Sequence, residues 1–119
     1  MNRNEFVEKY NNIKNILNKK EIETIILKSI EANSNDGNPR GHKSLIIVME
    51  ELAELSQAVS KELRGKGDRT NLLEEYADVV LCLQYIKAIA GFTDKQIDKA
   101  ITVKANRLNE TIIKNGKYE

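Results

Sequence analysis

The sequence predicts an all-α fold, a helical bundle built around a central antiparallel pair of long helices. Apolar residues recur at the three- and four-residue spacing of helices along most of the 119-residue chain, and no segment alternates apolar and polar residues as a half-buried strand does. The only proline and two of the six glycines fall in one polar stretch, residues 33–41, which marks a loop between helical segments.

Two packing helices are expected within residues 1–33, over about residues 2–18 and 20–32. Both carry apolar side chains at helical spacing on one side, which favours packing against other helices. These side chains are Phe6, Tyr10, Ile13 and Leu17 in the first helix and Ile22, Ile25, Ile26 and Ile30 in the second.

The two long helices that follow, over about residues 43–63 and 69–90, form the expected core pair. The polar segment between them, residues 64–68, is short, so the two helices should pack antiparallel. The main apolar stripe of the first of these helices consists of Leu45, Val48, Leu52, Leu55 and Val59.

A fifth helix is expected over about residues 94–114. Gly91 and Phe92 end the preceding helix, Thr93 and Gln96 have the spacing of a capping box, and Asn115-Gly116 closes the fifth helix. Residues 43–114 then form the core of a single domain that spans residues 1–119. Because residues 79–83 are apolar on every side of the fourth helix, we expect a homodimer or homotetramer to complete this core.

Composition excludes several classes of partner. A formal net charge of +1, without a basic patch, gives no reason to expect a nucleic-acid or membrane partner. No secretory signal opens the sequence, and no apolar run approaches the length of a membrane span. The single cysteine, Cys82, cannot form an internal disulfide and is expected in the core, so a cytoplasmic location is predicted.

Two acidic clusters lie in the most apolar part of the chain, within the two long helices. On the first helix Glu51 and Glu54 share a side next to the apolar stripe, and on the second Glu75 is in phase with apolar residues, with Asp78 one turn later. Glu74 points about 100° away from Glu75 and fits no ligand pair. Carboxylates are costly near a core unless a cation meets them, so this arrangement predicts a bound cation.

An antiparallel pair would bring the carboxylates of both helices around one space. A site made of carboxylate oxygens suits Mg²⁺, with Mn²⁺ as the alternative, rather than zinc or copper. For either cluster alone, a solvated helix face is the simpler explanation. The pairing of two such clusters on neighbouring helices favours a bound metal ion. A di-iron centre is excluded, because it needs two Glu-x-x-His motifs and His42 is the only histidine.

The motifs on these helices resemble those of the MazG-like all-α nucleotide pyrophosphohydrolases. In that family EExxE is followed, after a dozen to nearly thirty residues, by ExxD. Here Glu50-Glu51-x-x-Glu54 is followed, after a gap of twenty residues, by Glu75-x-x-Asp78. The resemblance covers about residues 43–90. A weaker resemblance extends to the Lys-Ala-Asn-Arg-Leu sequence of residues 104–108.

The resemblance implies a Mg²⁺-dependent enzyme that cleaves a nucleoside triphosphate between the α and β phosphates, giving the monophosphate and pyrophosphate. The implied metal ligands are Glu51, Glu54, Glu75 and Asp78. Glu50 would be an outer-shell or water-orienting residue. Together with the four ligands it makes an implied catalytic set of five acids. The alternative from another class is a non-catalytic helical oligomer that binds a metal or a nucleotide as a regulatory or interaction module.

Phosphate groups also require cations from the protein. Candidates lie around the polar turn and on the last helix, although surface charge is the simpler explanation for the turn. The turn candidates are Lys61 and Lys66, with Arg64 and Arg69 nearby, and the last helix offers Lys104 and Arg107. His42 and Asn38 could contact a base or sugar, and the absence of tryptophan leaves the base open.

Overall fold

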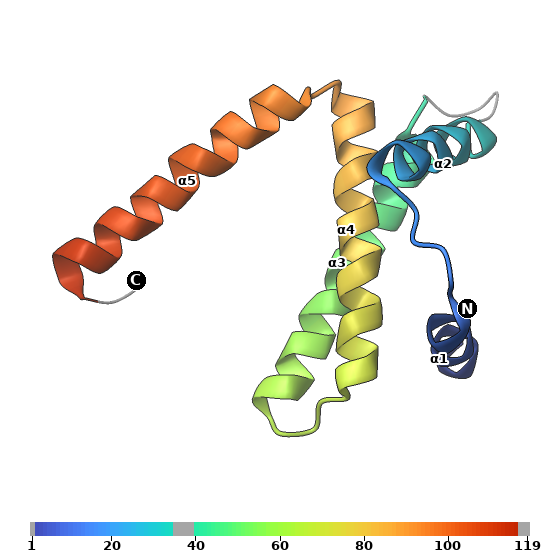
Figure 1. Ribbon diagram of the computed structural model, residues 1–119, viewed down its shortest axis with the longest axis horizontal. Coiled ribbons are helices and arrows are strands. Elements are labelled where there is room, and N and C mark those ends of the chain that lie inside the picture. The colour runs from blue at the N-terminus through green and yellow to red at the C-terminus, as the bar shows by residue number, and fades with distance from the viewer. Residues whose placement is uncertain (1, 35–39, 117–119) are drawn as a thin grey trace. The chain divides into compact units, whose positions relative to one another are not determined.

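The computed structural model describes residues 2–34 and 40–116, and all regular structure in these ranges is helical. The all-α prediction is therefore confirmed. The helices are α1 (Arg3–Asn12), α2 (Lys19–Ala32), α3 (His42–Leu63), α4 (Arg69–Ala90) and α5 (Asp94–Asn115) (Figure 1). None of them combines the length and apolar character that a membrane-crossing helix requires, within the described parts of the chain.

The chain divides into two compact units, Met1–Ile89 and Ala90–Glu119. The first unit contains α1 to α4, with α3 packed against α4, and the second contains α5. A single domain over residues 1–119 stays a prediction.

The first helix is shorter than its apolar pattern predicts. It ends at Asn12, and the backbone of Ile13 is already extended, with φ −68° and ψ 131°. Asn18 instead caps the next helix: its side chain accepts a hydrogen bond from the backbone N–H of Glu21, while the Glu21 side chain accepts one from the N–H of Asn18. This capping box requires a non-helical backbone at Asn18, so one continuous helix over residues 2–18 is excluded.

The later boundaries agree closely with the sequence patterns. Helix α4 covers the predicted residues, and α5 starts at the predicted capping box, in which Thr93 and Gln96 exchange hydrogen bonds of 2.8 and 3.1 Å. Gly116 ends α5 with φ +68°, a left-handed conformation that glycine adopts easily. Capping residues therefore located helix ends better than apolar periodicity did.

The buried core of the first unit joins α2, α3 and α4. Its most buried apolar side chains are Ile26, Ile30, Val48, Ala58 and Cys82. Polar contacts also connect α2 to α4: the hydroxyls of Ser29 and Tyr85 lie 2.5 Å apart, and the Lys87 ammonium donates to the Glu23 carboxylate at 3.1 Å. The predicted burial of Cys82 is confirmed.

The predicted main stripe of α3 is only partly buried. Val48 is buried and Leu55 half-buried, but Leu45, Leu52 and Val59 are 39%, 43% and 45% exposed. The helix turns a neighbouring side inward instead, where Ser44 and Ala58 are buried and Glu51 is half-buried. Small side chains at a helix contact allow a shorter interaxial distance, which explains why this side faces the core.

Replacing Gly41 with alanine is expected to lower the free energy of unfolding by about 2–4 kcal/mol, the sum of left-handed strain and overpacking. Gly41 precedes α3 with φ +84°, and a Cβ placed there would lie 2.9 Å from the Ile89 side chain. The matched control is Gly65→Ala, because Gly65 has φ +71° but no atom within 4 Å of such a Cβ. Urea unfolding of both variants measures the difference in their free energies of unfolding. Equal losses of stability would show that contact with Ile89 contributes nothing.

Candidate functional site

The acidic residues of the two motifs meet between α3 and α4. Glu51 and Glu54 come from α3 and Glu75 from α4, and one carboxylate oxygen of each lies within 4.8 Å of the others. Glu51 and Glu75 are half-buried and Glu54 is exposed, so the group opens to solvent on one side. The predicted convergence of the two motifs is present for these three acids.

Asp78 lies outside this group of three but contacts it. Its half-buried carboxyl is within hydrogen-bonding range of the Glu51 carboxyl, a contact that needs one of the two groups to hold a proton. Asp78 follows Glu75 by three residues on α4, so both side chains point to the same side of that helix. It is therefore placed as the fourth acid of the site.

Two carboxylate oxygens of the site have no donor. Oε2 of Glu51 and Oε2 of Glu75 are buried and accept no hydrogen bond from any described residue. No ion pair in residues 2–34 and 40–116 joins a lysine or arginine to the cluster. Buried polar oxygens without a partner are uncommon in native proteins, which indicates that a group from outside the chain satisfies them.

The electrostatics of the site follow mainly from burial and from the repulsion between neighbouring acids. Burial raises the pKa of Glu51 to about 7, and the charges of Asp78, Glu54 and Glu75 add to the effect. Burial likewise raises the pKa of Glu75, with the charge of Glu54 as the next cause. Burial also raises the pKa of Asp78, although its hydrogen bond with Glu51 acts in the opposite direction. Near neutral pH the acids therefore compete for protons.

The donor set fits a hard divalent cation. All candidate ligand atoms are carboxylate oxygens, the oxygens of three acids are close enough to share one ion, and two of the buried oxygens need a partner. Mg²⁺ and Mn²⁺ prefer such oxygen ligands, and the exposure of Glu54 means that water or phosphate could reach an ion held there.

Cys82 and Glu50 lie at the border of the site. The Cys82 thiol is 3% exposed, and burial, followed by the charges of Glu51 and Asp78, raises its pKa to about 11. A thiol in this state is a poor nucleophile, which agrees with its predicted structural role. Glu50 is exposed and is not one of the three converging acids, so its outer-shell role stays a prediction.

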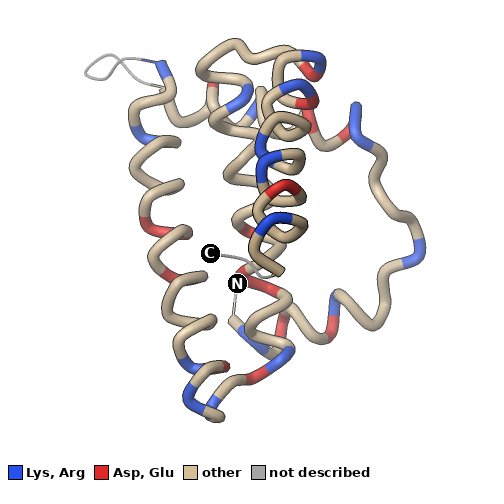
Figure 2. Tube along the Cα trace, turned by 90° about the vertical axis from the view of Figure 1, so that its left-hand side faces the viewer, with Lys and Arg blue, Asp and Glu red and all other residues tan. Residues whose placement is uncertain are grey.

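The predicted phosphate-binding residues are divided between the two units. Lys61 and Lys66 are exposed at the end of α3 and in the turn, and Figure 2 shows basic positions near both ends of α3 with acidic positions between them. Lys61 follows Glu54 by seven residues, so the two side chains share a side of α3 about 10 Å apart along its axis. A role for Lys61 and Lys66 in phosphate binding stays a prediction.

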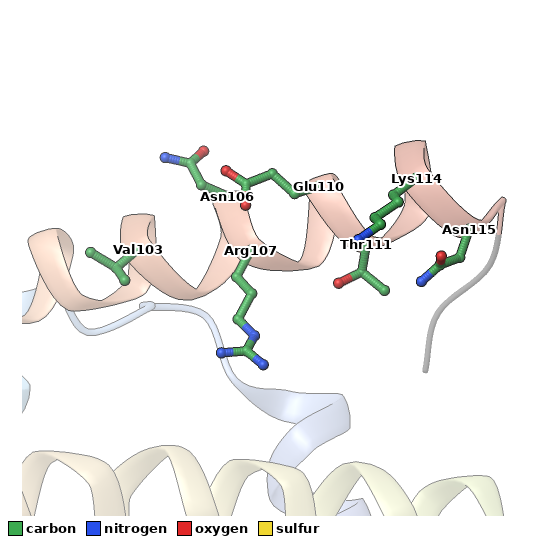
Figure 3. Close-up of a pocket in the computed structure, with 7 residues that line it drawn as sticks. All are labelled: Val103, Asn106, Arg107, Glu110, Thr111, Lys114 and Asn115. Atoms are coloured by element: carbon green, nitrogen blue, oxygen red, sulfur yellow. The ribbon is translucent and has the colours of Figure 1, made fainter.

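Lys104 and Arg107 lie on α5, in the second unit, and both are exposed. Arg107 lines a depression of about 600 Å³ along this helix, together with Asn106, Glu110 and Lys114 (Figure 3). Because one helix alone forms this depression, it is an open surface, and the roles of Lys104 and Arg107 in phosphate binding stay predictions. His42 is the exposed first residue of α3, and Asn38 lies outside the described residues.

The contact of Arg3 with the start of α4, the helix that carries Glu75 and Asp78, was not predicted from the sequence. Arg3, from α1, pairs with Asp68 through Nη1, and its Nη2 donates to Oδ1 of Asn71 at 2.6 Å. These partners are 65 and 68 residues away along the chain. No local pattern could have indicated this contact, because it depends on the docking of α1 against the start of α4.

The chain was also compared with known protein families, curated proteins and solved structures, and none of these comparisons gives a match.

Proposed function

We propose that this protein is a Mg²⁺-dependent nucleoside triphosphate pyrophosphohydrolase of the MazG-like type, which cleaves a (d)NTP to the (d)NMP and pyrophosphate. One observation carries the proposal. Carboxylate oxygens of Glu51 and Glu54 from the EExxE motif lie within 4.8 Å of one another and of Glu75 from the ExxD motif. The motifs are separate in the sequence, and their convergence supports a common chemical role.

In this proposal α3 and α4 form an antiparallel pair, and Glu51, Glu54, Glu75 and Asp78 hold Mg²⁺, with Mn²⁺ as a possible substitute. Bound there, the ion would neutralise phosphate oxygens and activate the attacking water. Glu50 is exposed next to Glu51, where its carboxylate could orient the water or accept its proton. No serine, cysteine or histidine nucleophile is needed, in keeping with the buried Cys82.

The unfavourable electrostatics of the cluster support a functional role over a structural one. The pKa of Glu51 is raised to about 7 because its negative charge is disfavoured by burial and by the neighbouring acids. A group that served folding alone would be more stable as a neutral residue or beside a lysine. Strongly perturbed carboxyls that share one site are typical of catalytic or metal-binding positions.

The direct test is a panel of standard and modified ribo- and deoxyribonucleoside triphosphates, incubated with the protein and Mg²⁺ and assayed for pyrophosphate and monophosphate. We expect release of pyrophosphate, rather than inorganic phosphate, from at least one nucleotide, and loss of the activity with excess EDTA. Calorimetric binding of nucleotide and Mg²⁺ without turnover of any nucleotide would instead favour the non-catalytic binding module.

We also propose that α3 and α4 mediate self-association. Large apolar side chains on these two helices are 39–85% exposed, and most of those on α4 have the three- and four-residue spacing of a helix-packing seam. The exposed set is Leu45, Ile46, Met49, Leu52, Val59 and Leu63 on α3, with Leu73, Tyr76, Val80, Leu81 and Leu83 on α4. Contiguous apolar patches of this kind commonly mark an interface.

The variant Leu83→Glu is expected to shift the protein from an oligomer to a monomer, because a charge in an apolar interface is strongly disfavoured. Leu83 is 55% exposed, and Leu27 on α2, which is 47% exposed, provides the control Leu27→Glu. Light scattering after size exclusion gives the mass of each variant. A monomeric wild-type chain, or an unchanged mass for Leu83→Glu, would refute this interface.

A further inference from the structure

The N-terminal helix α1 brings a cation to the side of α4 that carries the acidic site. Arg3 binds two residues at the start of α4, pairing with Asp68 and donating to Asn71 at 2.6 Å. Both partners belong to the same compact unit as the acidic cluster. Figure 1 shows α1 beside the half of α4 that begins at the turn.

The position of Asn71 on α4 relates Arg3 to the cluster. Asn71, Glu75 and Asp78 are spaced by four and three residues, which places them on one side of the helix. All three residues are half-buried, as expected for one side that faces the interior. Asn71 and Glu75 are one turn apart, about 6 Å along the helix axis. Arg3 therefore binds α4 about one turn before Glu75, on the side of the helix that carries the acidic site.

Arg3 also retains donors for a ligand. Its two contacts use two of the five N–H donors of a guanidinium group, and the side chain is still 40% exposed. A guanidinium binds a phosphate group through paired N–H donors, which an ammonium group cannot do. A polyphosphate held by a cation between Glu51, Glu54 and Glu75 would carry negative charge beyond that cation, toward the edge of the site.

We propose that Arg3 is a phosphate-binding residue of this site, and that α1 contributes it to bind the polyphosphate chain of the substrate. This inference rests on the proposed function, because it takes a metal-bound polyphosphate as the ligand. It assigns a role to the N-terminal segment, which lies outside the EExxE and ExxD motifs.

The competing explanation is that Arg3 only tethers α1 to α4. The substitution Asp68→Asn separates the two roles. Oδ1 of Asp68 accepts hydrogen bonds from the backbone N–H groups of Thr70 and Asn71, and an asparagine oxygen can accept them equally well. The same substitution removes the negative charge that pairs with Arg3. It therefore weakens the tether and leaves the guanidinium free for phosphate.

The experiment is isothermal titration of the full chain with inorganic tripolyphosphate in excess Mg²⁺, which needs no turnover and no knowledge of the base. We expect Arg3→Gln to weaken tripolyphosphate binding about tenfold, the effect of losing a charge-assisted contact. Arg3→Lys should fall between Arg3→Gln and the wild type, and Asp68→Asn should bind as tightly as the wild type or more tightly. Thermal unfolding of each variant confirms that it is folded.

Each outcome bears on a different claim. Wild-type affinity in Arg3→Gln, or equal weakening in Arg3→Gln and Asp68→Asn, would overturn the role of Arg3 and leave the proposed function intact. Binding that depends on both Mg²⁺ and Arg3, without turnover of any nucleotide, would support the role of Arg3 and refute the hydrolase. Failure of the wild-type chain to bind tripolyphosphate with Mg²⁺ would overturn both.

Discussion

Replacing Glu51 with glutamine is expected to reduce pyrophosphate release by about 10³-fold or more, since the contribution of a metal ligand is several kcal/mol of transition-state stabilisation. The same substitution should stabilise the metal-free protein at pH 8. Glutamine keeps the shape of the side chain and removes the charge that Asp78, Glu54 and Glu75 disfavour. Opposite effects on activity and stability are the signature of a residue retained for function.

The matched control for this variant is Glu74→Gln. Glu74 is half-buried on α4 next to Glu75 but is not one of the converging acids, so its loss should leave most of the activity. Both variants are assayed for pyrophosphate release and for thermal unfolding in EDTA. If Glu51→Gln retains full activity, or if it destabilises the metal-free protein, Glu51 is not the metal ligand proposed here.

The acidic site could be predicted because its signal is local. The spacing within each motif fixes which side of its helix the acids occupy, and the short turn fixes that α3 and α4 are neighbours. Those two facts place Glu51, Glu54 and Glu75 on neighbouring helices, where they can meet. The closeness of three acids and the outer position of Asp78 depend on how the helices are rotated, which spacing alone does not determine.

Burial on α3 was harder to predict, because apolar periodicity does not distinguish a core from an interface. Leu45, Leu52 and Val59 have the spacing of a buried stripe, yet they are about two-fifths exposed in the chain described here. The neighbouring side is buried instead, with the small residues Ser44 and Ala58. A strongly apolar stripe that stays exposed is expected where a second surface must cover it.

In the N-terminal segment, one feature had a signal in the sequence and another had none. The end of its first helix was predicted at Asn18 rather than Asn12, although the Asn18–Glu21 capping box, which excludes Asn18 from that helix, is present in the sequence. The contact of Arg3 with Asp68 has no sequence signal, because it links positions 65 residues apart. The residues of a local cap are close together in the sequence and can be predicted from it, whereas long-range polar contacts depend on the fold.

The metal-free protein is expected to become less stable as pH rises from about 5 to 8. The pKa of Glu51 is raised from 4.5 to about 7 in the folded chain, so the folded state binds this proton more tightly than the unfolded state does. Stability is therefore highest below the unfolded pKa and falls as pH rises through the folded one. The raised pKa values of Glu75 and Asp78 act in the same direction.

The size of the effect follows from the shift at Glu51. A shift from 4.5 to about 7 corresponds to at most about 3–4 kcal/mol, and solvent screening at this half-buried group reduces it to roughly 1–2 kcal/mol. The lowered pKa of Asp68 has the opposite sign, but its contribution is lost only as pH falls below its usual range, outside this window. Urea unfolding in EDTA at several pH values measures the slope.

Mg²⁺ should reverse this pH dependence, because it binds the ionised acids and competes with their protons. At ten times its dissociation constant the ion stabilises the folded state by about 1.4 kcal/mol, and the stabilisation should be larger at pH 8 than at pH 6. Glu51→Gln should lose most of both effects. His42→Gln should keep both effects, because His42 is an exposed residue at the start of α3 and is not one of the converging acids. A metal-free stability that is flat or rises from pH 5 to 8 would mean that the acids are not held together at one site.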